Sequence, residues 1–228
     1  MTLRLRDRIE GDLVIEVAFT DSALDLGDRA DVEVRRSALE AVAEETRTMP
    51  VIMRQVHGAH VAVVDIVGTP PVADGLVTTQ HNLALLARAA DCVPVLLGDP
   101  VAGVVAAVHC GRPGLAVGVV PTAVRRMYEL GAEKFTAWVG PHVCGDCYEV
   151  PEEMRTEVAA VVPESFATTS WGTPSLDLGA GVRAQLEALG VSVHTVGGCT
   201  REDPSFPSYR RDGDAATRFA GLVWMRQP

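Results

Sequence analysis

The sequence has 228 residues, with 20 Lys and Arg against 30 Asp and Glu, so its formal net charge is −10. Hydrophobic residues make up 47% of the chain and charged residues 22%, which excludes a mainly disordered protein. The acidic balance argues against partners that need a broad basic face, namely nucleic acids and anionic membranes. Because no apolar segment reads as a transmembrane helix or a secretory signal, we expect a cytoplasmic protein.

Apolar periodicity along the chain predicts alternating strands and helices. Strands are expected at residues 13–19, 51–55, 60–67, 83–90, 93–97, 101–108, 135–139, 191–196 and 222–226. Helices are expected at residues 31–48, 152–161 and 179–189, with one more from a Gly/Pro loop at 111–114 to about Leu130. Residues 101–108 are only Val, Ala and Gly, typical of a strand buried on both faces. The alternation favours a mixed α/β layered sandwich of sheets flanked by helices, as one domain over 1–228.

Three residues that can bind a metal stand at the ends of strand-like runs. They are His57 in RQVHG, Cys92 in AADC and His109 in VVAAVHCG. Two imidazoles and a thiolate form a three-ligand zinc set with an open fourth position, the pattern of catalytic zinc. Bound zinc lowers the pKa of water toward 7, which makes water a nucleophile. The spacing matches no short zinc motif, so two core histidines with a buried thiol remain the alternative.

Further motifs allow both a functional and a structural interpretation. Cys144 and Cys147 form a CxxC, which fits half a zinc site, a redox pair or two thiols in a turn. Cys199 and His194 could complete a zinc site only if the fold brings them near. The five cysteines in total are an odd number, which argues against a disulfide framework.

Charged residues near Gly turns suggest ligand contacts. Arg210 and Arg211 in SYRRDG are candidates for an anion site, because guanidinium groups bind phosphate bidentately, or else they belong to a solvated loop. Asp74 in ADGLVT either orients a ligating histidine or begins an Asp-Gly turn before a strand.

Taken in order, several segments resemble one known family. These segments are RQVHG (54–58), ADGLVT (73–78), AADCVPVLL (89–97), GVVAAVHCG (103–111), VGPHVCGDCYEV (139–150), LDLGAGVRAQLEALGV (176–191) and CT…SYRRDG (199–213). The chain is similar to the bacterial laccase-domain or polyphenol oxidoreductase family, whose members are described as purine nucleoside phosphorylases. The resemblance runs from about Val14 to Trp224.

The resemblance implies both a fold and an activity. It implies an α/β sandwich with zinc on His57, Cys92 and His109, which would also be the catalytic residues. The implied reactions are phosphorolysis of adenosine, inosine and S-methyl-5'-thioadenosine, with adenosine deamination as a second activity. The implied partners are a purine nucleoside and phosphate, in a monomer or homodimer. Copper oxidase chemistry fits less well, because one His/His/Cys set has too few ligands for several copper ions.

Substrate contacts are expected from Gln55, Asp74, Arg112, Arg210 and Arg211. The sequence departs from the family in one loop, which usually reads HAGWRG and here reads HCGRPG (109–114). Arg112 therefore stands at the family's Trp position, and Pro113 stands where the family has Arg. The family's SLNLG stretch reads ALDLG (23–27) here. Two alternatives stay open: a non-catalytic zinc- or nucleotide-binding homologue, and a hydrolase with Cys92 as nucleophile.

Overall fold

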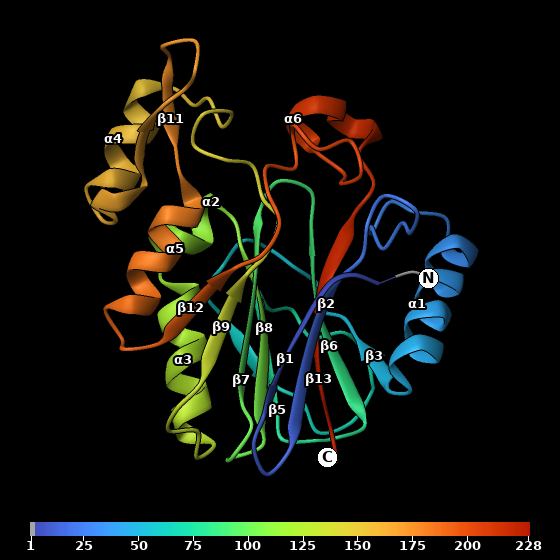
Figure 1. Ribbon diagram of the computed structural model, residues 1–228. Helices are drawn as coiled ribbons and strands as arrows, with labels where there is room; N and C mark the ends of the chain where they lie inside the picture. Colours follow the sequence, from blue (N-terminus) through green and yellow to red (C-terminus); the bar gives the residue numbers. More distant parts are fainter. Residues whose placement is uncertain (1–2) are drawn as a thin grey trace.

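Two β-sheets lie face to face between helices in the computed structural model, which describes residues 3–228 (Figure 1). The first sheet has the order β1 (Arg4–Glu10), β2 (Val14–Phe19), β13 (Phe219–Arg226), β6 (Leu83–Ala89) and β3 (Met49–Val51). The second has the order β12 (Ser192–Thr195), β9 (Thr136–Val139), β7 (Val93–Asp99), β8 (Val104–Cys110), β5 (Gly75–Thr78) and β4 (Val61–Val63). Both sheets combine parallel and antiparallel pairs, so the predicted mixed architecture is confirmed.

Helices cover the outer faces of both sheets. Against the first sheet lies α1 (Val32–Thr46), and against the second lie α2 (Arg112–Ala116), α3 (Val119–Glu129) and α5 (Leu178–Glu187) (Figure 1). The remaining elements are α4 (Glu152–Ala159), the 3₁₀ turns η1 (Pro163–Ser165) and η2 (Gly213–Ala215), the hairpin of β10 (Phe166–Thr168) with β11 (Pro174–Leu176), and α6 (Tyr209–Asp212). Within residues 3–228, none of the helices combines the length and apolarity that crossing a bilayer requires.

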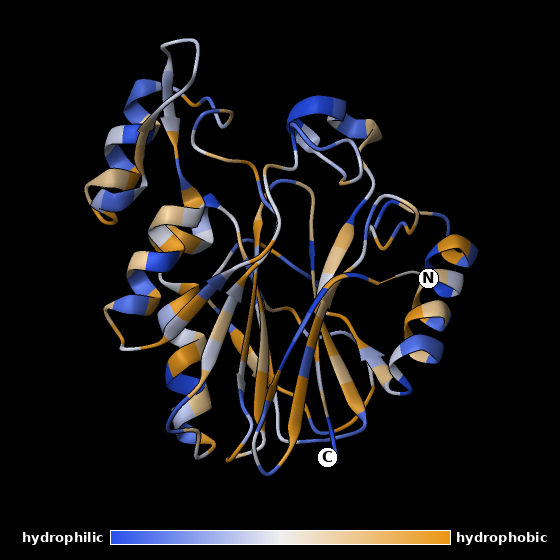
Figure 2. Cartoon of the chain, viewed as in Figure 1, coloured by the Kyte–Doolittle hydropathy of each residue, from blue (hydrophilic) through white to orange (hydrophobic). Residues whose placement is uncertain are grey.

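The central strands are apolar on both faces because each face meets a different layer. In β8, Val104, Ala106 and Val108 pack in the core beneath α3, while Val105 and Ala107 pack between the two sheets. Successive side chains of a strand point to opposite faces, so one strand serves both cores. Orange residues accordingly predominate in the inner strands, while the helices carry orange and blue residues on different sides (Figure 2).

The helical region after β8 begins earlier than expected, and it is broken at a different glycine. The predicted loop at 111–114 is wrong, because Arg112 begins α2 and Pro113 occupies its first turn. Proline is tolerated there because its missing N–H would have no intrahelical partner. The break comes instead at Gly118, whose φ of 77° separates α2 from α3.

Strand boundaries differ most at the edges of the sheets. The expected strand at 51–55 is wrong, since β3 ends at Val51 and Arg54 makes only an isolated bridge to Val72. The expected strand at 101–108 begins later, at Val104, after a turn closed by Gly103. Sequence reasoning missed β1 because it is an exposed edge strand in which Arg, Asp and Glu outnumber apolar residues.

Arg88 is a charged residue inside an otherwise apolar strand, and it anchors two loops. Its guanidinium donates to Leu26 O at 3.0 Å and Met53 O at 2.7 Å, and it pairs with Asp28. Arg88 is 3% exposed, and Leu26 and Met53, whose carbonyl groups it binds, are fully buried.

Replacing Arg88 with Met is expected to lower the free energy of unfolding by about 2–4 kcal/mol, because two buried carbonyls lose their donor. Urea denaturation with an unchanged m-value measures the loss. Arg126→Met is the control: this exposed ion pair with Glu129 on α3 is expected to contribute less than about 1 kcal/mol. Equal effects of the two substitutions would contradict the anchoring role of Arg88.

Candidate metal centre and its cavity

The pairing of β7 with β8 brings Cys92 and His109 together. These strands are antiparallel, with Pro94 opposite His109, so the start of β7 lies beside the end of β8. Cys92 immediately precedes β7 and His109 is the penultimate residue of β8. The loop after β3 adds His57, and the three segments meet although 35 and 17 residues separate the side chains along the chain.

The three side chains form a compact group. One ligand atom from each of His57, Cys92 and His109 lies within 4.8 Å of the others, and Cys92 Sγ is 3.8 Å from His57 Nε2. The two imidazole rings stand edge to face, with centroids 4.8 Å apart. His109 is buried, Cys92 is partly exposed and His57 is exposed, so the group is open to one side only.

A single carboxylate holds this group in place. Asp74, fully buried, accepts hydrogen bonds from the backbone N–H groups of His57 (2.9 Å) and Gly58 (2.7 Å), and more weakly from that of Val56 (3.2 Å). It also contacts His109 Nδ1 at 2.9 Å. Nδ1 of His109 is thereby engaged, which leaves its Nε2 to face Cys92 and any metal.

The same contacts stabilise an unusual backbone conformation. His57 has a φ of 61°, in the left-handed region that costs a non-glycine residue about 1–3 kcal/mol. The three N–H donors around Asp74 offset this cost and direct the His57 ring toward Cys92. The predicted part of Asp74 in orienting a histidine therefore has a geometric basis.

Cys92 and His109 shift each other's protonation. Burial by itself raises the pKa of the Cys92 thiol, but the charge on His109 and hydrogen bonds from both histidines outweigh it and lower this pKa to about 6. Burial by itself lowers the pKa of His109, but the Cys92 charge and the bond to Asp74 raise it above its ordinary value. Both shifts favour a thiolate on Cys92 and an imidazolium on His109 when no metal is bound, and metal binding would then release the imidazolium proton.

The geometry and the chemistry of the donors fit zinc. Ideal tetrahedral bonds of about 2.0–2.1 Å to nitrogen and 2.3 Å to sulfur place the two ligand atoms about 3.6 Å apart. The Cys92–His57 separation of 3.8 Å is close to this value. A methyl group at Gly111 would approach His57 Cδ2 to 2.6 Å and Cys92 Sγ to 3.1 Å, so the glycine keeps space beside the ligand atoms.

A cavity of about 820 Å³ opens onto the three side chains. Its size suits a small organic ligand. Of the other residues predicted to contact substrate, Gln55 and Arg210 line it, whereas Asp74, Arg112 and Arg211 do not. Asp74 lies behind His57 and His109, and Arg112 begins α2.

Two of the predicted substrate residues have structural partners. Gln55 exchanges two hydrogen bonds with the backbone of Arg88, at 2.8 and 3.0 Å, which ties its segment to β6. Arg211 directs its guanidinium to Asp212 and to the carbonyl oxygens of the segment that precedes it, including Thr200 O and Phe206 O at 2.8 Å. Arg211 therefore stabilises that segment, and its placement does not support the predicted phosphate contact.

The cavity wall also carries residues beyond those predicted to contact substrate. The wall includes Arg29, Arg88 and Arg218, together with the aromatic rings of Tyr148 and Tyr209. An arginine within the apolar run LALLARA was a usable signal for Arg88. The others stand in loops or at their ends, and only the fold shows that they share one wall.

Asp91 connects the base of this cavity to its roof. It is a buried residue next to Cys92 with a φ of 89°. Its carboxylate accepts from Thr200 Oγ1 at 2.7 Å and from the backbone N–H of Arg210 at 2.6 Å. The Arg210 guanidinium then stacks on the Tyr148 ring, 4.4 Å from its centroid, and its Nη1 donates to Glu149 O at 2.7 Å. Arg210 is thus held at the cavity wall from two sides.

A second group of residues that could hold a metal ion consists of Cys144, Cys147, Cys199 and Glu202. Cys199 and His194 were the two residues that could have completed a zinc site with the CxxC. The fold brings Cys199 to the CxxC turn. His194 is directed elsewhere, since its ring lies 3.5 Å from Asp7 and against Trp138.

Comparison with known proteins agrees with the resemblance seen in the motifs. Residues 14–226 match the family described as multi-copper polyphenol oxidoreductase laccase. A Streptomyces coelicolor protein named purine nucleoside phosphorylase is 59% identical over 179 residues, which are 76% of this chain and 74% of the relative. A Mycobacterium bovis protein with the same name is 46% identical over 203 residues, 87% of this chain and 81% of the relative.

A crystal structure has the same architecture. The Neisseria meningitidis protein NMB0706 superposes with a TM-score of 0.83 at 27% identity, and the match covers 97% of this chain and 99% of that one. Sequence and fold thus lead to one assignment. The chain belongs to the multi-copper polyphenol oxidoreductase laccase family.

Proposed function

We propose that this chain is a zinc-dependent purine nucleoside phosphorylase that acts on adenosine, inosine and S-methyl-5'-thioadenosine and also deaminates adenosine. The observation that carries the proposal is the His57, Cys92 and His109 group at the wall of an 820 Å³ cavity that also carries several arginines. Relatives at 46–59% identity that bear the name purine nucleoside phosphorylase support it. The enzyme would be cytoplasmic, as a monomer or homodimer.

Phosphorolysis forms a bond from a phosphate oxygen to the anomeric carbon and breaks the glycosidic bond to the purine. The protein must therefore hold a multiply charged anion beside the sugar, and positioning and electrostatic stabilisation supply most of the rate. Arg210, supported by Tyr148 and Asp91, is the best-placed candidate for this anion, with Arg29 and Arg218 on the same cavity wall. Guanidinium groups suit phosphate because they bind two oxygens at once.

Deamination needs an activated water at the purine. Zinc, when bound by His57, Cys92 and His109, supplies Lewis-acid polarisation and lowers the pKa of water. The chain's part is to present two imidazole nitrogens and a thiolate in fixed orientation, through Asp74. The cavity leaves the exposed side of His57 accessible to a ligand.

The copper oxidase interpretation has less support. The chain has six histidines, and only His57 and His109 occur in the metal-binding groups among residues 3–228. Several copper ions would need more imidazole ligands than these groups offer.

The proposal is tested by chromatography of adenosine incubated with zinc-loaded protein, with and without phosphate. Adenine that forms only with phosphate establishes phosphorolysis, and inosine establishes deamination. If neither adenine nor inosine forms, the proposal is overturned and a non-catalytic binding protein is favoured. In that case, the double variant Arg112→Trp/Pro113→Arg, which restores the family loop, tests whether HCGRPG is the cause.

A hydrolase with Cys92 as nucleophile is the second candidate, favoured by the lowered pKa of that thiol beside two histidines. The two candidates differ in their response to metal removal. A phosphorylase that needs zinc loses activity on chelation and regains it with zinc. A cysteine hydrolase keeps its activity without metal and loses it when Cys92 is alkylated.

A further inference from the structure

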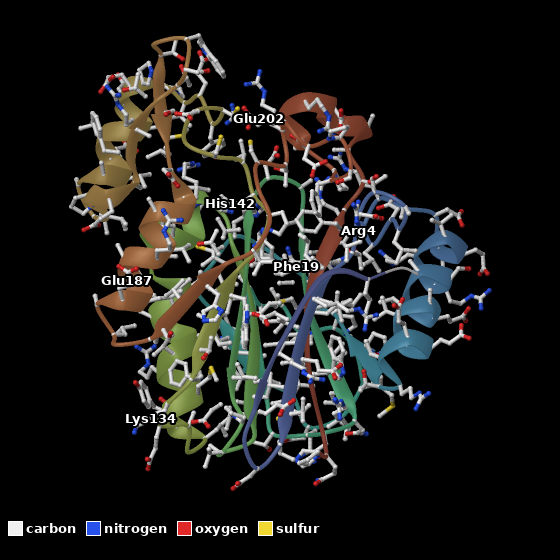
Figure 3. All side chains as sticks on the ribbon, in the orientation of Figure 1. Arg4, Phe19, Lys134, His142, Glu187 and Glu202 are labelled. Atoms are coloured by element: carbon white, nitrogen blue, oxygen red, sulfur yellow. The ribbon has the colours of Figure 1, made fainter. Side chains whose placement is uncertain are left out.

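The group of Cys144, Cys147, Cys199 and Glu202 has no part in the function proposed above. Its four ligand atoms lie within 4.8 Å of one another. Cys144 and Cys147 belong to the loop between β9 and α4, while Cys199 and Glu202 follow β12. Glu202 lies at the upper end of the molecule, above the sheets (Figure 3).

The backbone folds the two cysteines of the CxxC toward one point. The N–H groups of Cys147 and Tyr148 both donate to Cys144 O at 3.0 Å, which closes a tight turn. Gly145 is needed in this turn, since a Cβ there would lie 3.0 Å from Asp177 Cβ and 3.2 Å from Ala167 Cβ. The turn places both sulfur atoms on the side that faces Cys199.

The second segment is held against this turn by main-chain bonds. His142 and Cys199 form a parallel bridge, with Thr200 N donating to His142 O at 3.0 Å. Cys144 N donates to Cys199 Sγ at 3.4 Å, which holds this sulfur atom against the CxxC turn. Glu202 N donates to Cys199 O at 3.2 Å, so a second turn brings the Glu202 side chain back over the sulfur atoms.

These four side chains fit a closed zinc site. Tetrahedral zinc with sulfur bonds of about 2.3 Å places neighbouring sulfur atoms about 3.8 Å apart. The four ligand atoms here all lie within 4.8 Å of one another. Three thiolates select a soft ion such as zinc over magnesium or calcium. With Glu202 as fourth ligand, no position is left for substrate, which is the pattern of a structural site. Arg201, on the same surface hollow as Cys147, supplies positive charge beside the thiolates.

We propose that Cys144, Cys147, Cys199 and Glu202 bind one structural zinc ion, in addition to the His57, Cys92 and His109 site. The ion would join two segments that form the roof of the cavity. The first contributes Val143 and Tyr148 to the cavity wall, and the second continues to Tyr209 and Arg210. The site would therefore fix the roof independently of the reaction at the other metal ligands.

The test is a count of zinc per chain by elemental analysis of the full-length protein purified with zinc. Wild type is expected to contain two zinc ions per chain, Cys199→Ala one, Cys92→Ala one, and the double variant none. Cys110→Ala is the matched control, because Cys110 is a buried core thiol outside both groups, and it is expected to keep both ions.

A spectroscopic measurement distinguishes the two sites without relying on activity. Cobalt(II) replaces zinc after chelation, and its thiolate charge-transfer band grows with the number of bound thiolates. Cys92→Ala is expected to keep a strong band from three thiolates, and Cys199→Ala to lose most of the wild-type intensity.

Three outcomes would overturn the proposal. In the first, wild type and Cys199→Ala each contain one zinc ion per chain. In the second, wild type and Cys199→Ala each contain two. The third is an intact mass for wild type that lacks two hydrogens, with Cys144 joined to Cys147 or Cys199, which would show a disulfide instead. If Cys199→Ala fails to fold, Cys92→Ala decides the matter: one zinc ion retained in it supports the site, and none overturns it.

Discussion

Cys92→Ala is expected to lower kcat/KM for phosphorolysis about 10³-fold or more. Metal charge stabilisation is worth several kcal/mol, and each 1.36 kcal/mol changes a rate tenfold. Cys92 is the only sulfur ligand in its group, so the substitution leaves two imidazoles to hold the ion. Steady-state kinetics with adenosine and phosphate measure the effect, and elemental analysis measures the lost zinc in the same preparation.

Cys110→Ala is the control for general effects of removing a thiol. Cys110 is fully buried beside His109 in the chain, but its side chain packs in the core under α2 and α3. We expect it to keep zinc and activity. If Cys92→Ala kept both full zinc and full activity, Cys92 would be neither ligand nor nucleophile. If it kept full zinc but lost activity, the nucleophile interpretation would be favoured over the ligand.

The fold could be predicted where one physical signal dominates. Residues of β8 are Val and Ala up to His109, and a strand buried on both faces needs such a run. The end of α1 could not be placed as exactly, because Arg47, with a φ of 56°, ends the helix without a glycine. In β1 the signal fails, since pairing with β2 holds a charged edge strand that has little apolar pattern of its own.

The candidate site, too, could be predicted only in part. Residue type and position at strand ends indicated His57, Cys92 and His109, and the structure brings these three together. Their roles as zinc ligands remain a prediction. What the sequence lacks is the register of β7 against β8, which decides that Cys92 meets His109.

The arginines of the cavity show more clearly what could not be predicted from the sequence. Arg210 and Arg211 are adjacent, yet one lines the cavity and the other donates to the carbonyl oxygens of its own segment. A short helix turns successive side chains by about 100°, so neighbours face different surroundings. Arg29 carried no local motif, whereas Arg218 lies just beyond SYRRDG. They reach the same cavity from opposite ends of the chain.

Asp74→Asn is expected to lower zinc affinity at the His57, Cys92 and His109 site by about 10–100-fold, the usual effect of losing a group that orients a ligating histidine. An amide has only one acceptor oxygen, and its NH₂ would face the backbone donors of residues 56–58. His109 Nδ1 would lose its ionic partner, and its ring orientation with it. Titration of apo protein with zinc against a competing chelator measures the change.

The same substitution is expected to reduce stability in a pH-dependent way. Burial by itself raises the pKa of Asp74, but the bonds from His109, Gly58 and His57 outweigh it and lower this pKa below the ordinary value. A lowered folded-state pKa contributes stability at pH values above the unfolded pKa, and that contribution disappears as pH falls through the folded pKa. Wild type should therefore exceed Asp74→Asn by about 2–4 kcal/mol near neutral pH, with the difference shrinking in acid.

Asp99→Asn separates orientation of the metal ligands from general stability. Asp99 is also buried, accepts from four backbone N–H groups at 2.9–3.1 Å and has a lowered pKa. It stands at the far end of β7, about 23 Å along the strand from Cys92. It should therefore cost comparable stability and leave zinc affinity and kcat/KM unchanged. If Asp99→Asn lowered zinc affinity as much as Asp74→Asn does, the effect at Asp74 would be one of stability, and its role in orienting His109 would be lost.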